Sequence, residues 1–527
     1  MRVSALALGR IGCALAGALL LAAASPATAA DARDVLGVSH AAGLYNFTSE
    51  DYLNEGADRV LELGSRVIKV FLVPDRIQDL YPFNSDWSPL PANLVELVQK
   101  PYVQDLFAKP FSTFILETTP VSGVPQFLDG LTAGEADAER DQMYQLTKYL
   151  LTTYADSGKT FILQNWEGDH ILRQGLAEGA DPDPVRIQGM IDWWNARQDG
   201  VKKARKEIGS RGVRVLHAAE VNLLGAAMAG KVTATNNVIP FTHCDLYSYS
   251  SWDLGFSPAQ LTRALDYLES KAPDNALFGR YNLYLGEFGM AKDHGASEGE
   301  RFERIRELME AALGWGVRYA VYWQVYCNEA LQAYTGRPRN RDLRGFWLVR
   351  PDGARAPVWE TFESQLHAAF HRVALSNFSN QYVSVDDGDG AVSAGRWIRG
   401  GFWDTFTLKD WNGGALQTGD AVSLQAHGGL YLSVRPGSGK QVFATAATAG
   451  LSERFTIHKI GGAGPAGGIL PGILAGILPG ILPGDSIALE TRSGLYLGAE
   501  VAGRGAIRAL RSVPGPAEVF RYVAQEE

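Results

Sequence analysis

Residues 283–289 read Leu-Tyr-Leu-Gly-Glu-Phe-Gly, a short apolar run that ends in a glutamate between two glycines. Short apolar runs bounded by glycine are typical of strands in a parallel sheet, whose two faces are both covered. Seven further runs of this kind precede or follow it. The eight predicted strands cover residues 35–39, 66–72, 113–118, 161–166, 213–219, 245–249, 282–287 and 319–325.

Helical patterns, with apolar residues recurring every three or four positions, separate these strands. They include residues 51–63, 138–154, 185–208, 258–270 and 300–313. Strands that alternate with helices favour βαβ units and a parallel sheet. Eight such units predict an α/β fold, a (β/α)8 TIM barrel over residues 31–373. The alternative, a doubly wound open sheet, would call for a glycine-rich phosphate loop after a strand, and none is visible.

Residues 374–527 lack helical periodicity and carry a threefold repeat. A tyrosine begins each repeated motif, and a phenylalanine follows 24 residues later: Tyr382 and Phe406, Tyr431 and Phe455, Tyr496 and Phe520. Three all-β repeats that close on one another resemble a β-trefoil of the fascin-like branch. Residues 461–484 interrupt this domain with a low-complexity Gly/Pro/Ile/Leu insertion. This insertion is explained either by slippage in a repetitive gene or by a role as a surface that contacts a partner.

The first thirty residues have the pattern of a secretory leader. Arg2 and Arg10 precede an apolar run, and small residues at 27–30 supply a cleavage site. We therefore expect residues 1–30 to be a signal peptide and the protein to be secreted, either extracellular or periplasmic, with no membrane span. Two cysteines remain after the leader, Cys244 and Cys327. The sequence leaves open whether they pair.

The chain is acidic, with 49 Lys and Arg against 58 Asp and Glu and a net charge of −9. A protein that binds the phosphate backbone needs a basic surface, so nucleic acid is not an expected partner. Ordinary proportions of hydrophobic (46%) and charged (20%) residues exclude a disordered or coiled-coil chain.

Two glutamates stand at the ends of predicted strands. The fourth strand leads into Gln-Asn-Trp-Glu at 164–167, and the seventh into Gly-Glu-Phe-Gly at 286–289. Chemistry in a TIM barrel lies at the carboxyl ends of the strands, so Glu167 and Glu287 are expected to face each other. Hydrolysis of a glycosidic bond needs such a pair: an acid that protonates the leaving oxygen, and a carboxylate that attacks or activates water.

These motifs resemble clan A of the retaining glycoside hydrolases, the cellulase-like (β/α)8 enzymes. Tyr-Trp-Gln at 322–324 and the stretch at 345–359 add to the resemblance. It implies that Glu287 is the nucleophile and Glu167 the acid/base of a double displacement on a poly- or oligosaccharide. It implies no metal and no organic cofactor. The alternative function is a catalytically inactive carbohydrate-binding lectin or adhesin.

Further residues are expected to bind substrate or support the two glutamates. The resemblance implies a tryptophan floor at Trp323, and Lys69 stands near the position of an arginine that supports the nucleophile in the clan. Asn165 is also expected to bind substrate: Trp166 separates it from Glu167, whereas the clan has Asn directly before its acid/base, but residues two apart in a strand share a face. The other predicted substrate-binding residues are Trp166, Asp169, Tyr247, Tyr249 and Trp252. Asp169 is also the main alternative to Glu167 as the acid/base.

Glu117 and Glu220, near the third and fifth strands, are expected to be structural or sugar-binding. Histidines at 40, 217 and 243 lie on or beside strands, which keeps a metal-dependent hydrolase as a minor alternative. The sequence leaves open the sugar, the linkage, endo or exo action and the oligomeric state.

Overall fold

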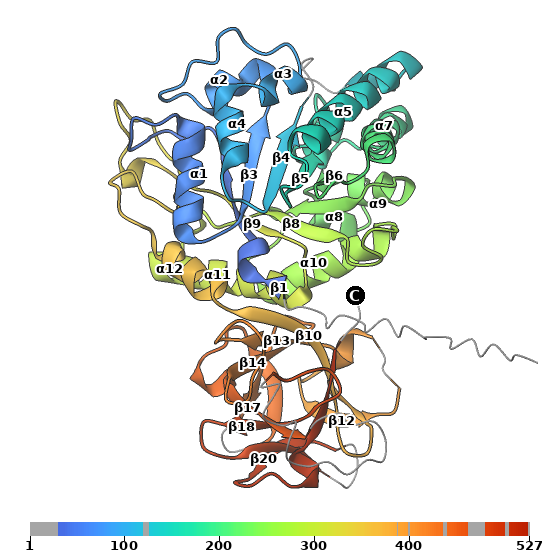
Figure 1. Cartoon of the computed structure of the whole chain (residues 1–527), viewed down its shortest axis with the longest axis vertical. Helices are drawn as coiled ribbons and strands as arrows, with labels where there is room; N and C mark the ends of the chain where they lie inside the picture. Colours follow the sequence, from blue (N-terminus) through green and yellow to red (C-terminus); the bar gives the residue numbers. More distant parts are fainter. Residues whose placement is uncertain are drawn as a thin grey trace, which may run out of the picture.

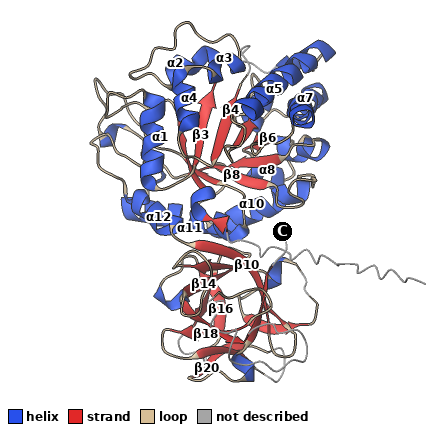
Figure 2. Ribbon diagram, in the orientation of Figure 1, coloured by secondary structure: helices blue, strands red, loops and turns tan. Residues whose placement is uncertain are grey.

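The computed structural model describes residues 30–119, 126–386, 388–398, 401–435, 440–461, 480–500 and 505–524. The predicted leader up to residue 29 and most of the predicted insertion, residues 462–479, lie outside the described residues. Figures 1 and 2 show two parts: a ring of strands surrounded by helices, and a strand-rich part below it.

The first part is a closed barrel of eight parallel strands, β2 to β9 in chain order, each paired with the next and β9 with β2. All eight predicted segments are strands of this barrel, which confirms the TIM-barrel prediction. The strands are β2 (Leu36–His40), β3 (Val67–Leu72), β4 (Thr113–Thr118), β5 (Thr160–Gln164), β6 (Arg214–Val221), β7 (Leu246–Ser250), β8 (Leu283–Phe288) and β9 (Ala320–Tyr322).

Helices cover the outside of the barrel (Figure 2). The long helix predicted at 138–154 begins earlier, at Ala133, because Thr132 and Glu135 form a capping box at its start. The helices are α1 (Tyr52–Leu63), α2 (Ile77–Leu80), α3 (Leu94–Val98), α4 (Pro101–Ala108), α5 (Ala133–Thr153), α6 (Gly168–Leu172), α7 (Pro184–Ile208), α8 (Leu224–Met228), α9 (Ala234–Asn237), α10 (Pro258–Lys271), α11 (Glu298–Trp315) and α12 (Pro357–Leu366).

Side chains that point into the barrel form two kinds of layer. Toward the start of the strands they are apolar and pack in one cluster that includes Val67, Ile115, Ile162, Ala218 and Leu246. Two positions further along the same strands, on the same face, the residues are all polar. They are Lys69, Glu117, Gln164, Glu220 and Ser248. The barrel therefore changes from a dry core to a charged layer toward the carboxyl ends of its strands.

The second part is an antiparallel sheet in which six strands close into a barrel: β10, β13, β14, β17, β18 and β21. Three hairpins, β11–β12, β15–β16 and β19–β20, join successive strands of this ring. The strands are β10 (Ala369–Ser376), β11 (Tyr382–Val385), β12 (Val392–Arg396), β13 (Phe406–Asp410), β14 (Ala421–Ala426), β15 (Tyr431–Val434), β16 (Val442–Ala446), β17 (Phe455–Gly461), β18 (Ser486–Thr491), β19 (Tyr496–Ala499), β20 (Ile507–Arg511) and β21 (Phe520–Ala524).

The threefold repeat in the sequence corresponds to three equivalent strand pairs. Each repeated tyrosine is the first residue of β11, β15 or β19, and the register of each hairpin shifts directly after it. Each repeated phenylalanine begins β13, β17 or β21 and is buried. The prediction of an all-β domain is therefore confirmed, and the assignment to the β-trefoil fold stays a prediction.

The two parts contact each other through several polar side chains on the outer helices and through Tyr281, whose ring packs against Phe402 and Arg372. Lys409 of β13 lies 3.4 Å from Glu310 of α11 and also donates to Gln365 of α12; all three are buried. Thr407 donates to the carbonyl of Gly314 at 2.6 Å. The short strand β1 (Ala30–Asp31) pairs with β10, so the start of the described chain also joins the second part.

Cys244 and Cys327 are both buried free thiols, which settles the question of pairing that the sequence left open. Within the described residues, no helix combines the length and the apolar character that crossing a membrane requires.

Candidate active site

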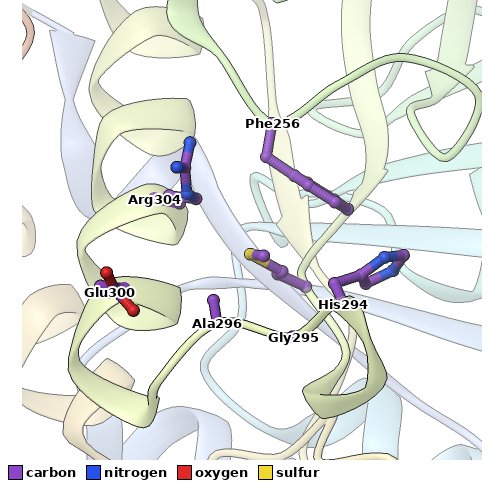
Figure 3. A pocket seen from close by; sticks show the side chains of 7 residues that line it. Phe256, His294, Gly295, Ala296, Glu300 and Arg304 are labelled. Atoms are coloured by element: carbon purple, nitrogen blue, oxygen red, sulfur yellow. The ribbon is translucent and has the colours of Figure 1, made fainter.

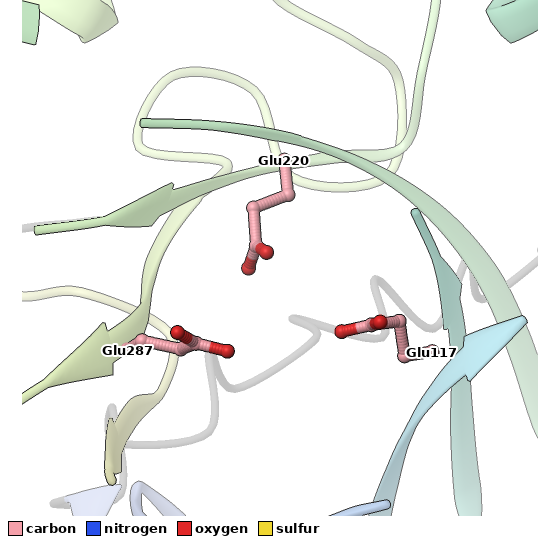
Figure 4. Close-up of side chains that lie close together, drawn as sticks. All are labelled: Glu117, Glu220 and Glu287. Atoms are coloured by element: carbon pink, nitrogen blue, oxygen red, sulfur yellow. The ribbon is translucent and has the colours of Figure 1, made fainter. Parts of the chain in front are cut away.

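Three carboxylates converge on one ammonium group in the charged layer of the barrel. Glu117, Glu220 and Glu287 come from β4, β6 and β8 and point toward one another (Figure 4). The Nζ atom of Lys69 lies 2.8 Å from Glu287, 3.4 Å from Glu220 and 3.7 Å from Glu117. All four side chains are almost completely excluded from solvent.

The glycine at 286 makes this arrangement sterically accessible. A Cβ atom at that position would lie 2.0 Å from Ser248 Oγ and 2.3 Å from Glu220 Oε2, so any other residue would displace these two side chains. The pairing of β8 with both neighbouring strands is irregular here, since Ser250 pairs with Glu287 after a register shift. Such a bulge re-aims the following side chain. It explains how Glu287 points inward directly after the inward-facing Gly286.

Glu287 is held by three donors. Lys69 contacts Oε1 at 2.8 Å, while Trp252 Nε1 donates to Oε2 at 3.0 Å and Ser250 Oγ lies 3.1 Å from the same oxygen. Charge-assisted hydrogen bonds of this kind stabilise an ionised carboxylate. Glu287 therefore has the environment of a carboxylate that is kept charged and fixed in position.

Glu167 lies three residues beyond the end of β5 and directly before α6. Its Oε1 lies 2.8 Å from Ser250 Oγ, and its Oε2 contacts His170 Nδ1 at 2.5 Å and Asn222 Nδ2 at 3.4 Å. The Ser250 hydroxyl thus touches both glutamates. Glu167 Oε1 and Glu287 Oε2 cannot lie more than 5.9 Å apart, which is the sum of 2.8 and 3.1 Å.

The charged layer holds more carboxylates than cations. Burial raises the pKa of Glu117 well above its ordinary value, and Lys69 offsets only part of that effect. Burial also raises the pKa of Glu220 to about 7, again against the attraction of Lys69. Burial alone would lower the pKa of Lys69, but the surrounding carboxylates raise it instead. Near neutral pH, the layer therefore holds a charged lysine beside Glu117 and Glu220, whose carboxyl groups are not fully ionised.

Oxygens of Glu117, Glu220 and Glu287 lie within 4.8 Å of one another, a spacing that would suit a metal ion. The Lys69 ammonium already lies within 3.7 Å of all three and supplies the positive charge that they face. The three histidines that suggested a metal-dependent hydrolase have other partners than these glutamates. His40 contacts Tyr52, His217 contacts Arg197, and His243 contacts Asp199.

Several predicted residues lie where the sequence placed them. Lys69 and Trp252 contact Glu287 directly. Trp166 is 44% exposed beside Glu167 and packs against His170, and Trp323 is half-buried against Phe71. Asn165 contacts the backbone instead: its amide donates to the carbonyl of Glu220 and its Oδ1 accepts from the Glu220 N–H. Its polar atoms tie β5 to β6.

Two of the predictions are corrected. Tyr247 and Tyr249 occupy the outward face of β7, where their hydroxyls bond Thr242 and Asp253. The alternation of the strand places Ser248 and Ser250 inside instead. Asp169 is fully buried and accepts hydrogen bonds from the backbone N–H groups of residues 222, 223 and 234. Asp169 therefore holds these loops together through hydrogen bonds and is not an alternative to Glu167 as the acid/base.

Four polar residues of the site were missed. Ser248 donates to Glu220 and Ser250 contacts both glutamates, while His170 and Asn222 contact Glu167. The period-two pattern of β7, read from the apolar Leu246, could have identified the two serines. No local signal marks Asn222, which reaches Glu167 from the loop after β6.

A cavity of about 410 Å³ lies between the segments that follow β7 and β8. Phe256 and His294 line it in edge-to-face contact with each other, 4.9 Å between ring centroids, and Glu300 and Arg304 line it from α11 (Figure 3). None of the predicted site residues lines this cavity.

No family model and no curated protein sequence matches the chain. Among solved structures, the chain is similar to a GH5_18 protein of Streptomyces cattleya in complex with Manβ1-4GlcNAc, at 15% identity over 63% of this chain and 80% of that chain (TM-score 0.42). A GH39 β-xylosidase from Caulobacter crescentus matches at 15% identity over 73% and 78% (TM-score 0.38). A glycoside hydrolase 5 lichenase from a Caldicellulosiruptor species matches at 11% identity over 63% and 93% (TM-score 0.40). At these identities the likeness concerns the fold alone.

Proposed function

We propose that the protein is a retaining glycoside hydrolase in which Glu287 is the nucleophile and Glu167 the acid/base. The observation that carries this proposal is the hydroxyl of Ser250, which touches both carboxylates and limits the separation of their nearest oxygens to 5.9 Å. Retaining enzymes hold their two carboxyl groups about 5–5.5 Å apart, whereas inverting enzymes need about 6.5–9.5 Å to admit a water.

The shared hydroxyl also supports a division of roles. A serine hydroxyl has one hydrogen, so it donates to one carboxylate and accepts from the other. Glu287 has Lys69 and Trp252 as further donors and suits the ionised state. A proton on Glu167 would then complete the second hydrogen bond. This arrangement supplies a charged nucleophile beside a protonated acid before substrate binds.

The proposed reaction has two steps. Glu287 attacks the anomeric carbon while Glu167 gives its proton to the leaving oxygen, and the glycosidic bond breaks as a glycosyl–enzyme ester forms. Glu167, now ionised, takes a proton from water, which attacks the same carbon and releases Glu287. The sugar keeps its anomeric configuration, and Lys69 balances the charge that returns to Glu287.

Substitution of each glutamate, after a screen of aryl glycosides and glycans has found a substrate, tests the proposal. Glu287→Gly should lower kcat by several orders of magnitude, and azide should then yield a product of inverted configuration. Glu167→Ala should keep a near-native kcat/KM on dinitrophenyl glycosides, whose leaving group needs no proton, and azide should speed the slowed second step and give a retained product.

A Glu167→Ala enzyme that is equally slow with good and poor leaving groups, and does not respond to azide, would remove the acid/base assignment. Binding of a glycan without turnover of any glycoside in the screen would favour the inactive lectin or adhesin instead.

For the second part we propose a secreted β-trefoil domain that binds carbohydrate. The ring of six strands with three equivalent hairpins supports the trefoil, and Trp397, which is 69% exposed after β12, offers a ring on which a sugar could stack. Trp397→Ala should weaken retention on an insoluble glycan and leave hydrolysis of a small aryl glycoside unchanged. Export of the full-length chain with loss of residues 1–30 would test the leader.

A further inference from the structure

A second cavity, of about 430 Å³, lies between the segments that follow β8 and β9. Four basic residues line it: Lys292, Arg301, Arg341 and Arg350. Glu298 is the one acidic residue among those that line it. Such a concentration of positive charge is unusual for a chain with a net charge of −9.

Arg301 is the central feature of this cavity. It is 1% exposed, and its Nε, Nη1 and Nη2 atoms have no hydrogen-bond acceptor among the described residues. A guanidinium carries five N–H donors and stays charged at any physiological pH. Burying such a group without acceptors is costly, so native structures almost always pair it. A buried donor set that lines a cavity is what an anionic ligand would complete.

The surrounding residues hold Arg301 in place without pairing it. A Cβ atom at residue 345 would lie 2.6 Å from Arg301 Nη1, and the backbone there has φ +92°, so glycine both fits the turn and leaves room for the guanidinium. The ring of Phe302 lies 4.7 Å from the guanidinium carbon, a contact that offers no hydrogen-bond acceptor.

The carboxylates nearby have other partners. Arg350 donates to Glu298 at 2.6 Å, and Asp342 accepts from the backbone and side chain of Arg339. Lys292 donates to the carbonyl of Asn340 and lies 4.9 Å from the ring centroid of Trp347. Burial lowers the pKa of Lys292, and the neighbouring charge of Arg301 lowers it further. The positive charge of this cavity is therefore incompletely neutralised.

A second buried donor lines the same cavity. Trp347 is 2% exposed, and its Nε1 has no acceptor among the residues that the structure describes. The location is also favourable, since β8 and β9 are the seventh and eighth strands of the barrel. The segments after these strands often bind phosphate groups in TIM barrels.

We propose that this cavity is an oxyanion-binding site, separate from the carboxylate site, that takes a sulfate, phosphate or carboxylate group. Arg301 forms charge-assisted hydrogen bonds to the anion, Trp347 donates a further one, and Lys292 adds charge. The group belongs either to a free inorganic anion or to an acidic substituent on a glycan. The site does not depend on the proposed glycosidase activity.

Calorimetric titration of the full chain tests this site. The probes are sodium sulfate, sodium phosphate and a sulfated or uronate-containing oligosaccharide, each compared with sodium chloride or a neutral oligosaccharide at equal ionic strength. We expect saturable binding that Arg301→Met weakens about ten- to a hundredfold, the amount that loss of a charge-assisted hydrogen bond gives. Binding that is tighter for the acidic oligosaccharide assigns the anion to a glycan, and binding of the inorganic anions alone assigns a free ion.

The matched control is Arg304→Met, which removes an exposed arginine one turn further along α11 (Figure 3) and should leave the affinity unchanged. Trp347→Phe keeps the packing, removes one donor and should weaken binding less than Arg301→Met. Without anion, Arg301→Met should be at least as stable as the native chain, because it removes an unpaired buried charge. Equal affinities in the native chain, Arg301→Met and Trp347→Phe, or no saturable binding of any probe, would overturn the proposal.

Discussion

The ammonium of Lys69 lies 2.8 Å from the carboxylate of Glu287, and both side chains are almost fully buried. The two residues come from β3 and β8, strands that are not adjacent in the barrel. A buried ion pair is costly to form but more costly to break, because removing one partner leaves an uncompensated charge. The pair is therefore best understood as a device that keeps Glu287 ionised and in position.

Lys69→Met tests that role. We expect kcat/KM to fall by about a hundredfold or more, since the carboxylate loses its strongest electrostatic support. The measurement is kcat/KM on a small aryl glycoside, with Lys69→Arg as the variant that keeps the charge and should retain more activity. An unchanged kcat/KM in Lys69→Met would show that the lysine serves packing alone.

Ser250→Ala tests the bridge between the two glutamates. Loss of the shared hydroxyl should lower kcat/KM about ten- to a hundredfold and change the free energy of unfolding by about 1 kcal/mol. Ser251→Ala is the matched control, because Ser251 Oγ donates at 3.0 Å to the backbone carbonyl of Glu287 and contacts neither carboxylate. If both variants lose activity equally, the effect lies in the backbone of β8 and not in the bridge.

The predictions made from the sequence were most accurate for features that depend on the local pattern of a single strand or helix. The period of the strands and helices predicted the barrel, and the Gly-Glu-Phe-Gly motif placed Glu287 near the end of β8, since both depend on local pattern. The face of β7 was predicted wrongly, because Tyr247 and Tyr249 resemble sugar-binding residues although the register turns Ser248 and Ser250 inward. Asp169 was misjudged for a different reason: its partners are backbone N–H groups of distant loops, which leave no local signal.

Glu220 should make stability depend on pH. Its pKa is about 7 in the folded chain, against an ordinary value of 4.5. Between these values the unfolded chain releases the proton while the folded chain keeps it. The folded state is therefore favoured at low pH, and this advantage is lost as the pH rises through about 7. Glu220→Gln lacks the titrating group, so its Tm relative to the native chain should improve between about pH 5 and about pH 8. A Tm difference that stays constant over this range would contradict the prediction.

The contact between the two parts gives the last prediction. Lys409 of β13 is buried with Glu310 of α11, and its Nζ also lies 3.6 Å from the ring centroid of Trp411. Lys409→Met leaves Glu310 buried without its cation, so we expect a loss of about 3–5 kcal/mol in the free energy of unfolding. Hydrolysis of a small aryl glycoside should continue at the native kcat. The second part contacts the outer helices, β1 and Tyr281, which precedes β8, whereas Glu167 and Glu287 lie toward the carboxyl ends of their strands.

Lys202→Met, on the exposed face of α7, is the control and should change stability by less than about 0.5 kcal/mol. A chain that ends at Leu366, before β10, extends the test. It exposes Glu310 and Gln365 to water, which replaces Lys409 as their hydrogen-bonding partner. It should keep activity on the small substrate and unfold at a lower temperature than the full chain. Loss of activity in either Lys409→Met or the shortened chain, while circular dichroism shows a folded barrel, would mean that the second part helps to shape the carboxylate site from a distance.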